Sequence, residues 1–125
     1  MGQKKILIVD DETDLIMMVQ MRLEANGYEV ISANDGQEGL EKVKNESPDL
    51  ILMDVMMPKM NGYEVCGLLK NDTLYSKIPI ILFTGKAQQD FEEVGKKAGA
   101  DAFITKSFDP PELLAKIEEL LKKSS

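Results

Sequence analysis

Five short apolar runs recur along the chain, and each is followed by a segment with the spacing of an amphipathic helix. The runs are rich in Ile, Leu and Val with few polar interruptions, which is typical of strands buried on both faces. Strands and helices that alternate in this way form a parallel sheet with helices packed on both sides. The expected strands cover residues 5–9, 28–33, 49–54, 79–84 and 102–105.

The segments between these runs carry start and stop signals of helices. Asn26 and Gly27 end the first helix. Asp109, Pro110 and Glu112 supply an N-cap, a first helical residue and a capping-box partner for the last. The expected helices cover residues 13–25, 36–45, 62–70 and 88–98, followed by a last helix from residue 110.

The fourth expected helix contains Gly95, which costs about 1 kcal/mol of helix stability relative to Ala. Its apolar stripe is also thin, so we expect it to be the least stable helix. The whole pattern predicts an α/β fold, a doubly wound, five-stranded parallel sheet of the flavodoxin-like (βα)5 type. Of the two common strand orders we expect 2-1-3-4-5, which makes the first and third strands neighbours.

Composition limits the function to a few classes. The chain has 15 basic and 22 acidic residues, a net charge of −7, and no basic stripe, so we expect no direct binding of nucleic acid. It has neither an apolar run that could span a membrane nor a signal-peptide pattern. The single cysteine, Cys66, excludes an internal disulfide and is typical of a reducing, cytoplasmic location. Without histidine a zinc site is excluded, so any metal would be hard and bound through oxygen.

Charged or polar residues stand at the carboxyl side of four of the five expected strands. Asp10 and Asp11 follow the first strand, Asp54 ends the third, Thr84 ends the fourth and Lys106 follows the fifth. In open α/β sheets this edge is where ligands bind. Alone, each residue is best explained as a helix cap or a solvated loop residue. Together at one sheet edge they indicate a site.

Three carboxylates in one crevice repel each other and need a cation to compensate them. Two cations are available: a bound Mg²⁺, which prefers oxygen ligands, and the Lys106 ammonium. A carboxylate, a hard divalent ion, an ammonium and a hydroxyl around one point suit phosphoryl transfer. In such a reaction a carboxylate can be the nucleophile and form an aspartyl-phosphate.

Over nearly its whole length the chain resembles the receiver domain of two-component response regulators, of the single-domain type. The stretches that carry the resemblance are Val9-Asp10-Asp11-Glu12, Leu52 to Pro58 with Asn61-Gly62, Phe83-Thr84-Gly85, and Phe103-Ile104-Thr105-Lys106. Each stretch is weak alone, but the four in this order are a strong signal. The resemblance implies one domain, residues 1–125, that acts as a phosphorylation-activated signalling switch or a phosphorelay intermediate.

The resemblance also implies roles at the site. Asp54 would accept a phosphoryl group from a phosphohistidine on a histidine kinase or a histidine phosphotransfer protein. Asp11, Asp54 and the backbone carbonyl of Met56 would bind Mg²⁺ directly, and Asp10 would help through a water molecule. Lys106 would pair with the phosphoryl group. The protein would be mainly a signalling protein that catalyses its own phosphorylation and a slow autodephosphorylation.

A conformational switch is implied as well. Thr84 would move to hydrogen-bond the phosphoryl group, and Phe103 would swing inward into the space that Thr84 leaves. The moving surface would comprise the fourth helix, the fifth strand and the fifth helix, and would act on an unidentified downstream protein.

One residue departs from the family pattern. Ser107 follows Lys106 where the family usually has a proline joined by a cis bond. A cis bond costs about 0.5–1 kcal/mol before Pro but about 2.5–4 kcal/mol before other residues. We therefore expect the bond between Lys106 and Ser107 to be trans.

The first expected helix carries methionines outside its core stripe. Met17 and Met21 point away from that stripe, and Met18 lies at its edge. Exposed methionines adapt to varied contacts, so we hypothesise that this patch docks the helical bundle of the phosphodonor. The alternative is an incidental apolar cluster on the surface.

Two other functions are left open by the sequence. A small Mg²⁺-dependent phosphatase of the haloacid-dehalogenase type would use Asp10 as its nucleophile, although that family has Asp where this chain has Glu12. A module of the same fold that binds proteins without being phosphorylated is the other alternative, and the intact site argues against it. We expect the chain to be either a stand-alone relay, without membrane attachment, or the receiver of a longer regulator.

Overall fold

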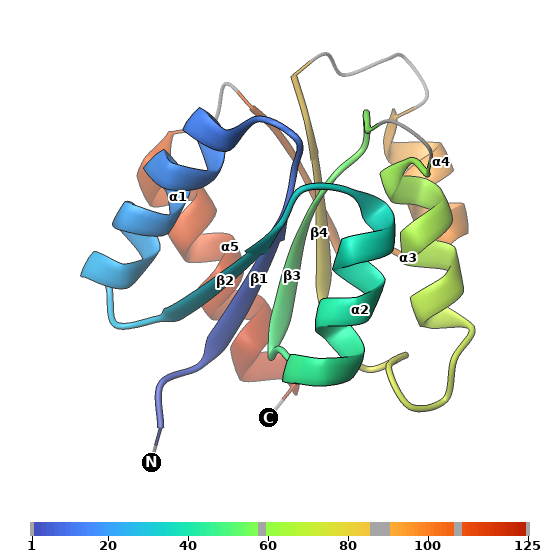
Figure 1. Cartoon of the computed structure of the whole chain (residues 1–125), viewed down its shortest axis with the longest axis horizontal. Helices are drawn as coiled ribbons and strands as arrows, with labels where there is room; N and C mark the ends of the chain where they lie inside the picture. Colours follow the sequence, from blue (N-terminus) through green and yellow to red (C-terminus); the bar gives the residue numbers. More distant parts are fainter. Residues whose placement is uncertain (1, 58–59, 86–90, 107–108, 125) are drawn as a thin grey trace.

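The computed structural model describes residues 2–57, 60–85, 91–106 and 109–124. In these residues strand and helix alternate from the first element to the last, and the strands form one parallel sheet in the order β2-β1-β3-β4-β5 (Figure 1). The predicted fold class and strand order are confirmed. The strands are β1 (Lys5–Val9), β2 (Glu29–Ala33), β3 (Leu50–Asp54), β4 (Ile80–Thr84) and β5 (Ala102–Thr105). The helices are α1 (Thr13–Ala25), α2 (Gly36–Glu46), α3 (Gly62–Lys70), α4 (Phe91–Ala98) and α5 (Pro110–Ser124).

The predicted boundaries agree with the observed ones to within one residue wherever the structure describes them. Strands β2, β3 and β4 each begin one residue later than predicted, and α2 ends one residue later. Residues 88–90 of the fourth predicted helix lie outside the described residues. At the end of α1, Asn26 is the C-cap and Gly27 follows with a φ of 91°, which is the predicted stop.

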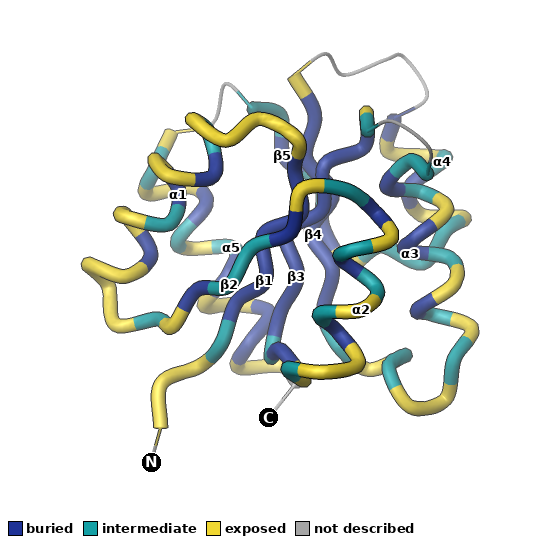
Figure 2. Tube along the Cα trace, in the orientation of Figure 1, coloured by how far each residue is buried: buried dark blue, intermediate teal, exposed yellow. Residues whose placement is uncertain are grey.

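Two apolar layers hold the sheet, one on each face. Along β1, Ile6 and Ile8 face the layer under α1 and α5, whereas Leu7 and Val9 face the layer under α2, α3 and α4. All four side chains are fully buried, which explains why the run carries no polar residue. Figure 2 shows the same arrangement, with buried strands at the centre and exposure along the outer sides of the helices. Each such burial stabilises the fold by about 1.5–3 kcal/mol.

The sheet register sets the carboxyl ends of the strands level with one another. Val9 of β1 pairs with Met53, Asp54 of β3 pairs with Phe83, and Thr84 of β4 pairs with Thr105. The residues that follow β1 and β5, and those that end β3 and β4, therefore leave the sheet at the same edge. In the described part of the chain no helix has the length and apolar character that a bilayer crossing requires.

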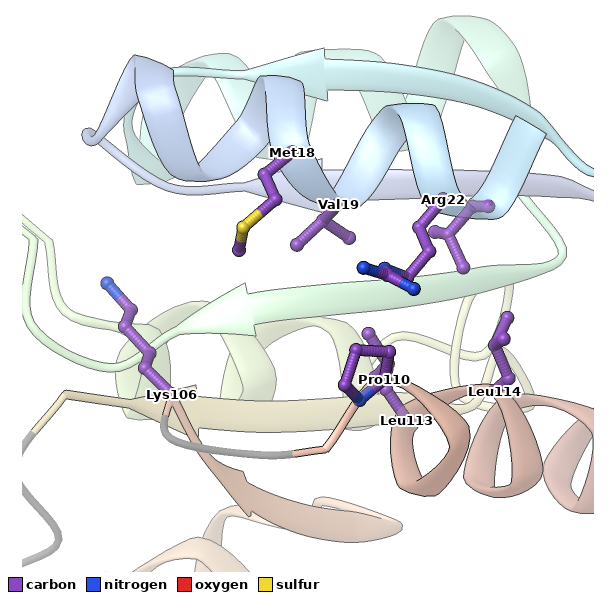
Figure 3. A pocket seen from close by; sticks show the side chains of 8 residues that line it. Met18, Val19, Arg22, Lys106, Pro110, Leu113 and Leu114 are labelled. Atoms are coloured by element: carbon purple, nitrogen blue, oxygen red, sulfur yellow. The ribbon is translucent and has the colours of Figure 1, made fainter. Parts of the chain in front are cut away.

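An apolar cavity of about 160 Å³ lies between α1 and α5. Side chains from the two helices point toward one another across it, and Lys106 reaches it from the end of β5 (Figure 3). The cavity is lined by Met18, Val19, Arg22, Leu23, Lys106, Pro110, Leu113 and Leu114.

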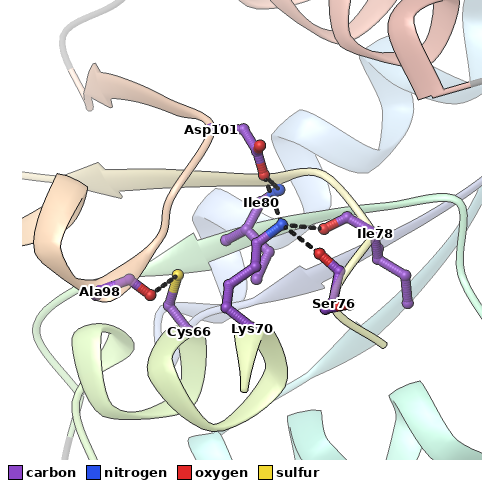
Figure 4. Close-up of polar contacts among 7 residues, drawn as sticks. All are labelled: Cys66, Lys70, Ser76, Ile78, Ile80, Ala98 and Asp101. Carbon is purple, nitrogen blue, oxygen red and sulfur yellow. Dashed lines mark hydrogen bonds and ion pairs between the residues drawn. The ribbon is translucent and has the colours of Figure 1, made fainter. Parts of the chain in front are cut away.

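An ion pair lies at the opposite edge of the sheet, where β4 and β5 begin. Lys70 Nζ, at the end of α3, donates hydrogen bonds to Asp101 Oδ2 at 2.8 Å, to the Ile78 carbonyl at 2.8 Å and to the Ser76 carbonyl at 3.1 Å (Figure 4). Asp101 Oδ2 also accepts from the Ile80 N–H at 2.8 Å. The contact therefore joins the end of α3 to the starts of β4 and β5.

Next to this contact, Cys66 is buried and its Sγ donates to the Ala98 carbonyl at 3.5 Å. Burial raises the pKa of the Cys66 thiol to about 11. Since the thiolate is the reactive form of cysteine, Cys66 is a packing residue that ties α3 to the end of α4.

Candidate functional site

Three polar side chains are buried at the carboxyl edge of the sheet, within the part of the chain that the structure describes. They are Asp10, Asp54 and Thr84, and none is more than 2% exposed. Burial of a charged or polar group costs free energy unless a partner compensates it. Such groups gathered at the ligand-binding edge of an α/β sheet indicate a functional site.

Lys106 is the cation among these carboxylates. Its Nζ lies 3.0 Å from Asp10 Oδ2, 3.4 Å from Asp54 Oδ2 and 2.8 Å from Glu12 Oε1. The ammonium also lies 5.4 Å from the centre of the Phe83 ring. The structure thus brings Asp10, Asp54 and Lys106 together.

Glu12 is the residue of this cluster for which no role was predicted. It occupies the N-cap of α1, where Ser, Thr, Asp or Asn is the common choice. Its side chain makes no capping hydrogen bond and binds Lys106 instead. The sequence contains one signal of this role. Glu12 stands at an N-cap, where a short capping side chain is usual, and so a different use of its carboxylate could have been expected.

The two carboxylate oxygens of Asp10 have different surroundings. Oδ1 accepts a hydrogen bond from the Glu12 N–H at 2.8 Å. Oδ2 forms the ion pair with Lys106 but accepts no hydrogen bond from the residues that the structure describes. The Lys106 ammonium compensates the charge of this oxygen, which can also accept a hydrogen bond from water or bind a metal ion.

The acidic residues around this oxygen have the donor chemistry of a hard divalent ion. Carboxylate oxygens of Asp10, Asp11 and Glu12 lie within 4.8 Å of one another. Among the described residues, these carboxylates and that of Asp54 make four, and Lys106 supplies the ammonium beside them. An all-oxygen, strongly anionic set of this kind fits Mg²⁺. Met56, the residue expected to add a carbonyl ligand, lies two residues after the end of β3 and donates its N–H to Asp54 Oδ1 at 3.3 Å.

Burial and mutual repulsion change the acidity of the cluster. Burial, and then the charge of Asp10, raise the pKa of Asp54 to about 6, although the Lys106 ammonium opposes this. Burial likewise raises the pKa of Asp10. For Lys106, burial alone would lower the pKa, but Glu12, Asp10 and Asp54 outweigh it and raise the pKa above its usual range. Lys106 therefore stays charged, and Asp54 ionises at a higher pH than an exposed aspartate does.

The start of α3 fixes the backbone of Asp54. Asn61 and Glu64 form a capping box, in which each side chain accepts from the other residue's backbone N–H. The Gly62 N–H donates to the Val55 carbonyl at 2.9 Å, and a side chain at Gly62 would overlap the carbonyl of Asp54. Glycine at position 62 lets α3 pack directly on the end of β3.

The two residues predicted to switch lie on neighbouring strands. Thr84 ends β4, and Phe103 of β5 pairs with Leu82, two residues before Thr84. Because side chains two residues apart share a sheet face, Thr84 and Phe103 both face the layer under α4. The half-buried Phe103 ring packs edge-to-face on Phe91, with ring centres 5.7 Å apart. Phe103 is thus next to α4 and not part of the carboxylate cluster.

Two further predictions concern residues around the cluster. The predicted trans bond after Lys106 involves residue 107, which lies outside the described residues. Met17, Met18 and Met21 are all exposed on α1, and Met18 also lines the cavity between α1 and α5.

A parallel sheet whose carboxyl edge gathers buried aspartates, a threonine and a lysine defines a class of signalling domains that phosphorylation controls. The family model for the response regulator receiver domain matches residues 6–118. The chain belongs to this family, which rules out membership of the haloacid-dehalogenase-type phosphatases.

Its relatives include transcriptional regulators. The chain is 44% identical over 121 residues to the alkaline phosphatase synthesis transcriptional regulatory protein PhoP of Bacillus subtilis (strain 168), covering 97% of this chain and 50% of that protein. It is 41% identical over 121 residues to the phosphate regulon transcriptional regulatory protein PhoB of Pseudomonas aeruginosa, covering 97% of this chain and 53% of that protein. The chain therefore spans about half the length of the curated relatives it matches.

Solved structures show the same fold. A CheY-like receiver domain protein from Methanospirillum hungatei JF-1 has a TM-score of 0.91 and 38% identity, covering 98% of this chain and 97% of that chain. The chemotaxis protein CheY4 of Vibrio cholerae has a TM-score of 0.89 and 34% identity, covering 95% of this chain and 99% of that chain. The similarity extends over the whole fold and supports a phosphorylation-activated signalling switch.

Proposed function

We propose that Asp54 accepts a phosphoryl group from a phosphohistidine on a histidine kinase or histidine phosphotransfer protein. The observation that carries this is the buried Asp54 carboxylate, 3.4 Å from Lys106 Nζ at the carboxyl edge of the sheet. One Asp54 oxygen forms a bond to phosphorus as the P–N bond breaks, and the imidazole of the donor leaves with the bonding pair. Residues 1–125 would act as one receiver unit in this reaction.

The neighbouring residues have complementary tasks. Asp11, Asp54 and the Met56 carbonyl would hold Mg²⁺, with Asp10 assisting through water, and the bound ion supplies positive charge to the phosphoryl oxygens. Lys106 neutralises another phosphoryl oxygen. Its ammonium already lies within reach of the nucleophile and remains protonated.

The signal would leave through α4, β5 and α5. Thr84 would turn toward the phosphoryl group, and Phe103 would move into the vacated space on the same sheet face. One feature supports this surface. The ring of Phe103 contacts both Phe91 and Gly95, so a movement of this ring would act directly on α4. A downstream protein would recognise the altered surface, without direct contact between this receiver and nucleic acid.

The donor would dock on α1. Met17, Met18 and Met21 are exposed on α1, and Met18 lines the cavity between α1 and α5, which also reaches Lys106. A helical bundle seated on this surface would therefore present its phosphohistidine near Asp54. Methionine side chains adapt their shape to a partner's apolar residues.

Incubation with acetyl phosphate and Mg²⁺, followed by intact mass spectrometry, tests the assignment. The wild type should gain the mass of one phosphoryl group, and Asp54→Asn should gain none. Peptide mapping after trapping should place the group on Asp54, and a label on Asp10 would refute this assignment. An unlabelled wild type would favour the alternative of an unphosphorylated binding module.

A further inference from the structure

We propose that Glu12 is an internal anion that occupies Lys106 in the unphosphorylated protein and must leave it when a phosphoryl group reaches Asp54. The inference rests on the proposed function, because Lys106 is the cation that would receive the phosphoryl oxygens. Glu12 would thus be a positioning residue that slows the entry of the phosphoryl group into the site.

Distance and exposure single out Glu12 among the partners of Lys106. Glu12 Oε1 is the nearest carboxylate oxygen to Lys106 Nζ, at 2.8 Å, and its side chain is 62% exposed. The side chains of Asp10 and Asp54 are 0% and 1% exposed. Glu12 is therefore the partner on the solvent side, and the one whose carboxylate can return to water at little cost.

The backbone of Glu12 is fixed by hydrogen bonds to its neighbours in the chain, whereas its exposed side chain is held by the contact with Lys106. Its N–H donates to Asp10 Oδ1 at 2.8 Å, and its carbonyl accepts from the Ile16 N–H at 3.1 Å in the first turn of α1. The carboxylate makes no capping bond to the helix, and among the residues that the structure describes its hydrogen-bond partner is Lys106. Release of Lys106 requires only rotation of the Glu12 side chain.

The pair also bridges the sheet edge. Glu12 follows β1 and Lys106 follows β5, and strands β3 and β4 lie between them. Three strand spacings amount to about 14 Å, so both side chains extend toward the middle, where Asp54 ends β3. The contact thus lies on the solvent side of Asp54.

Charge repulsion and burial determine which partner of Lys106, Glu12 or Asp10, moves when a phosphoryl group arrives. Phosphoryl oxygens carry negative charge and are repelled by the Glu12 carboxylate. Asp10 cannot withdraw, because it is buried and one of its oxygens is engaged by the Glu12 N–H. Removal of the Glu12 charge should therefore ease the approach of an anionic donor and free Lys106 to meet it.

The experiment compares Glu12→Gln with a matched control, Asp14→Asn. Asp14 is an exposed acid in the first turn of the same helix and is not an ion-pair partner of Lys106. Its substitution by Asn changes the net charge by the same amount as Glu12→Gln. The rate of Asp54 phosphorylation is measured with acetyl phosphate at saturating Mg²⁺, where the P–O bond to the acetyl group breaks and acetate leaves. Glu12→Gln should react about three- to tenfold faster than the wild type. Asp14→Asn should stay within about twofold, since screened charges act weakly at a distance.

A second measurement does not depend on Mg²⁺ or on catalysis. In EDTA, the ¹⁵N NMR signal of the Lys106 ammonium should shift in Glu12→Gln and stay unchanged in Asp14→Asn. An unshifted signal would show that the pair does not form in solution and would overturn the inference.

Kinetic outcomes separate the two proposals. If the wild type is phosphorylated on Asp54 but Glu12→Gln matches Asp14→Asn, the inference about Glu12 fails and the proposed function stands. Slower phosphorylation together with weaker Mg²⁺ binding would also overturn it, by making Glu12 a cation-binding residue. If the wild type is not phosphorylated, the proposed function fails and the gating role of Glu12 fails with it, whatever the NMR signal shows of the pair.

Discussion

Gly95 of α4 packs directly against the ring of Phe103 in β5, and a Cβ atom at position 95 would overlap the ring carbons. The sequence alone marked Gly95 as a weakness of the fourth helix. The structure gives the reason for a glycine there, because the aromatic ring fills the space of a side chain. The helix that is expected to move and the residue that is expected to move it are thus in direct contact.

Substitution of Gly95 by Ala should therefore destabilise the protein. Ala improves helix propensity by about 1 kcal/mol, but overpacking against Phe103 costs about 1–3 kcal/mol, so we expect a net loss of about 1 kcal/mol. Gly67→Ala is the control: Gly67 lies within α3, and a Cβ there meets no atom within 4 Å. Gly67→Ala should stabilise by about 0.5–1 kcal/mol. Urea unfolding measures both, and equal effects would refute the packing argument.

Asp54→Asn should stabilise the metal-free protein at neutral pH. The pKa of Asp54 is raised from 3.8 to about 6, chiefly by burial, so the folded protein keeps this proton at a pH where the unfolded chain has lost it. The free energy of unfolding of the wild type therefore falls as pH rises from about 4 to 6. Asn does not ionise, so the Asp54→Asn variant keeps its free energy of unfolding as pH rises. We expect this variant to be more stable than the wild type by about 1–3 kcal/mol at pH 7.

Urea unfolding in EDTA between pH 4 and 8 measures this difference. The two proteins should converge near pH 4, where the unfolded chain also keeps the proton. A constant difference across the whole range would mean that ionisation of Asp54 is not its cause.

Mg²⁺ should stabilise the wild type and stabilise Asp11→Asn much less. A ligand that binds only the folded state adds about 2.7 kcal/mol when its concentration is 100-fold above its Kd. Asp11 is exposed, so its loss should leave the metal-free stability nearly unchanged. Thermal unfolding with and without Mg²⁺ measures this stabilisation. The control variant Asp14→Asn should be stabilised by Mg²⁺ as much as the wild type. If Mg²⁺ stabilised Asp11→Asn as much as the wild type, Asp11 would not be a ligand of the ion.

A charge on the methionine patch should impair the donor protein but not a small donor. Met21 is 70% exposed on α1, and we expect Met21→Glu to slow phosphotransfer from a histidine kinase that phosphorylates the wild type by about tenfold or more. Its rate with acetyl phosphate should not change. Leu74→Glu places the same charge at a 79% exposed apolar residue outside α1 and should slow neither reaction. An unimpaired Met21→Glu would end the docking hypothesis.

The sheet and the position of the site could be predicted because both follow from local patterns. The apolar run that becomes β3 and the Asp54 at its end are adjacent in the sequence, and parallel strands bring such ends to one edge. The contact of Glu12 with Lys106 could not be predicted in this way, because the residues are 94 positions apart and meet only through the reach of two long side chains. The contact of Lys70 with Asp101 depends on packing of the same kind.

Hydrogen bonds hold the carboxyl end of α4 and the residues that follow it. The Asp101 N–H donates to the Ile80 carbonyl at 2.9 Å, and the Ala98 carbonyl accepts from Cys66, so the carboxyl end of α4 is anchored to α3 and β4. A helix of eight residues is about 12 Å long. Pivoting by about 10° on its anchored end would displace the Phe91 end by about 2 Å and leave Ala98 in place. A partner that reads such a tilt would do so at the amino-terminal turn of α4, on the side of the molecule where Thr84 ends its strand.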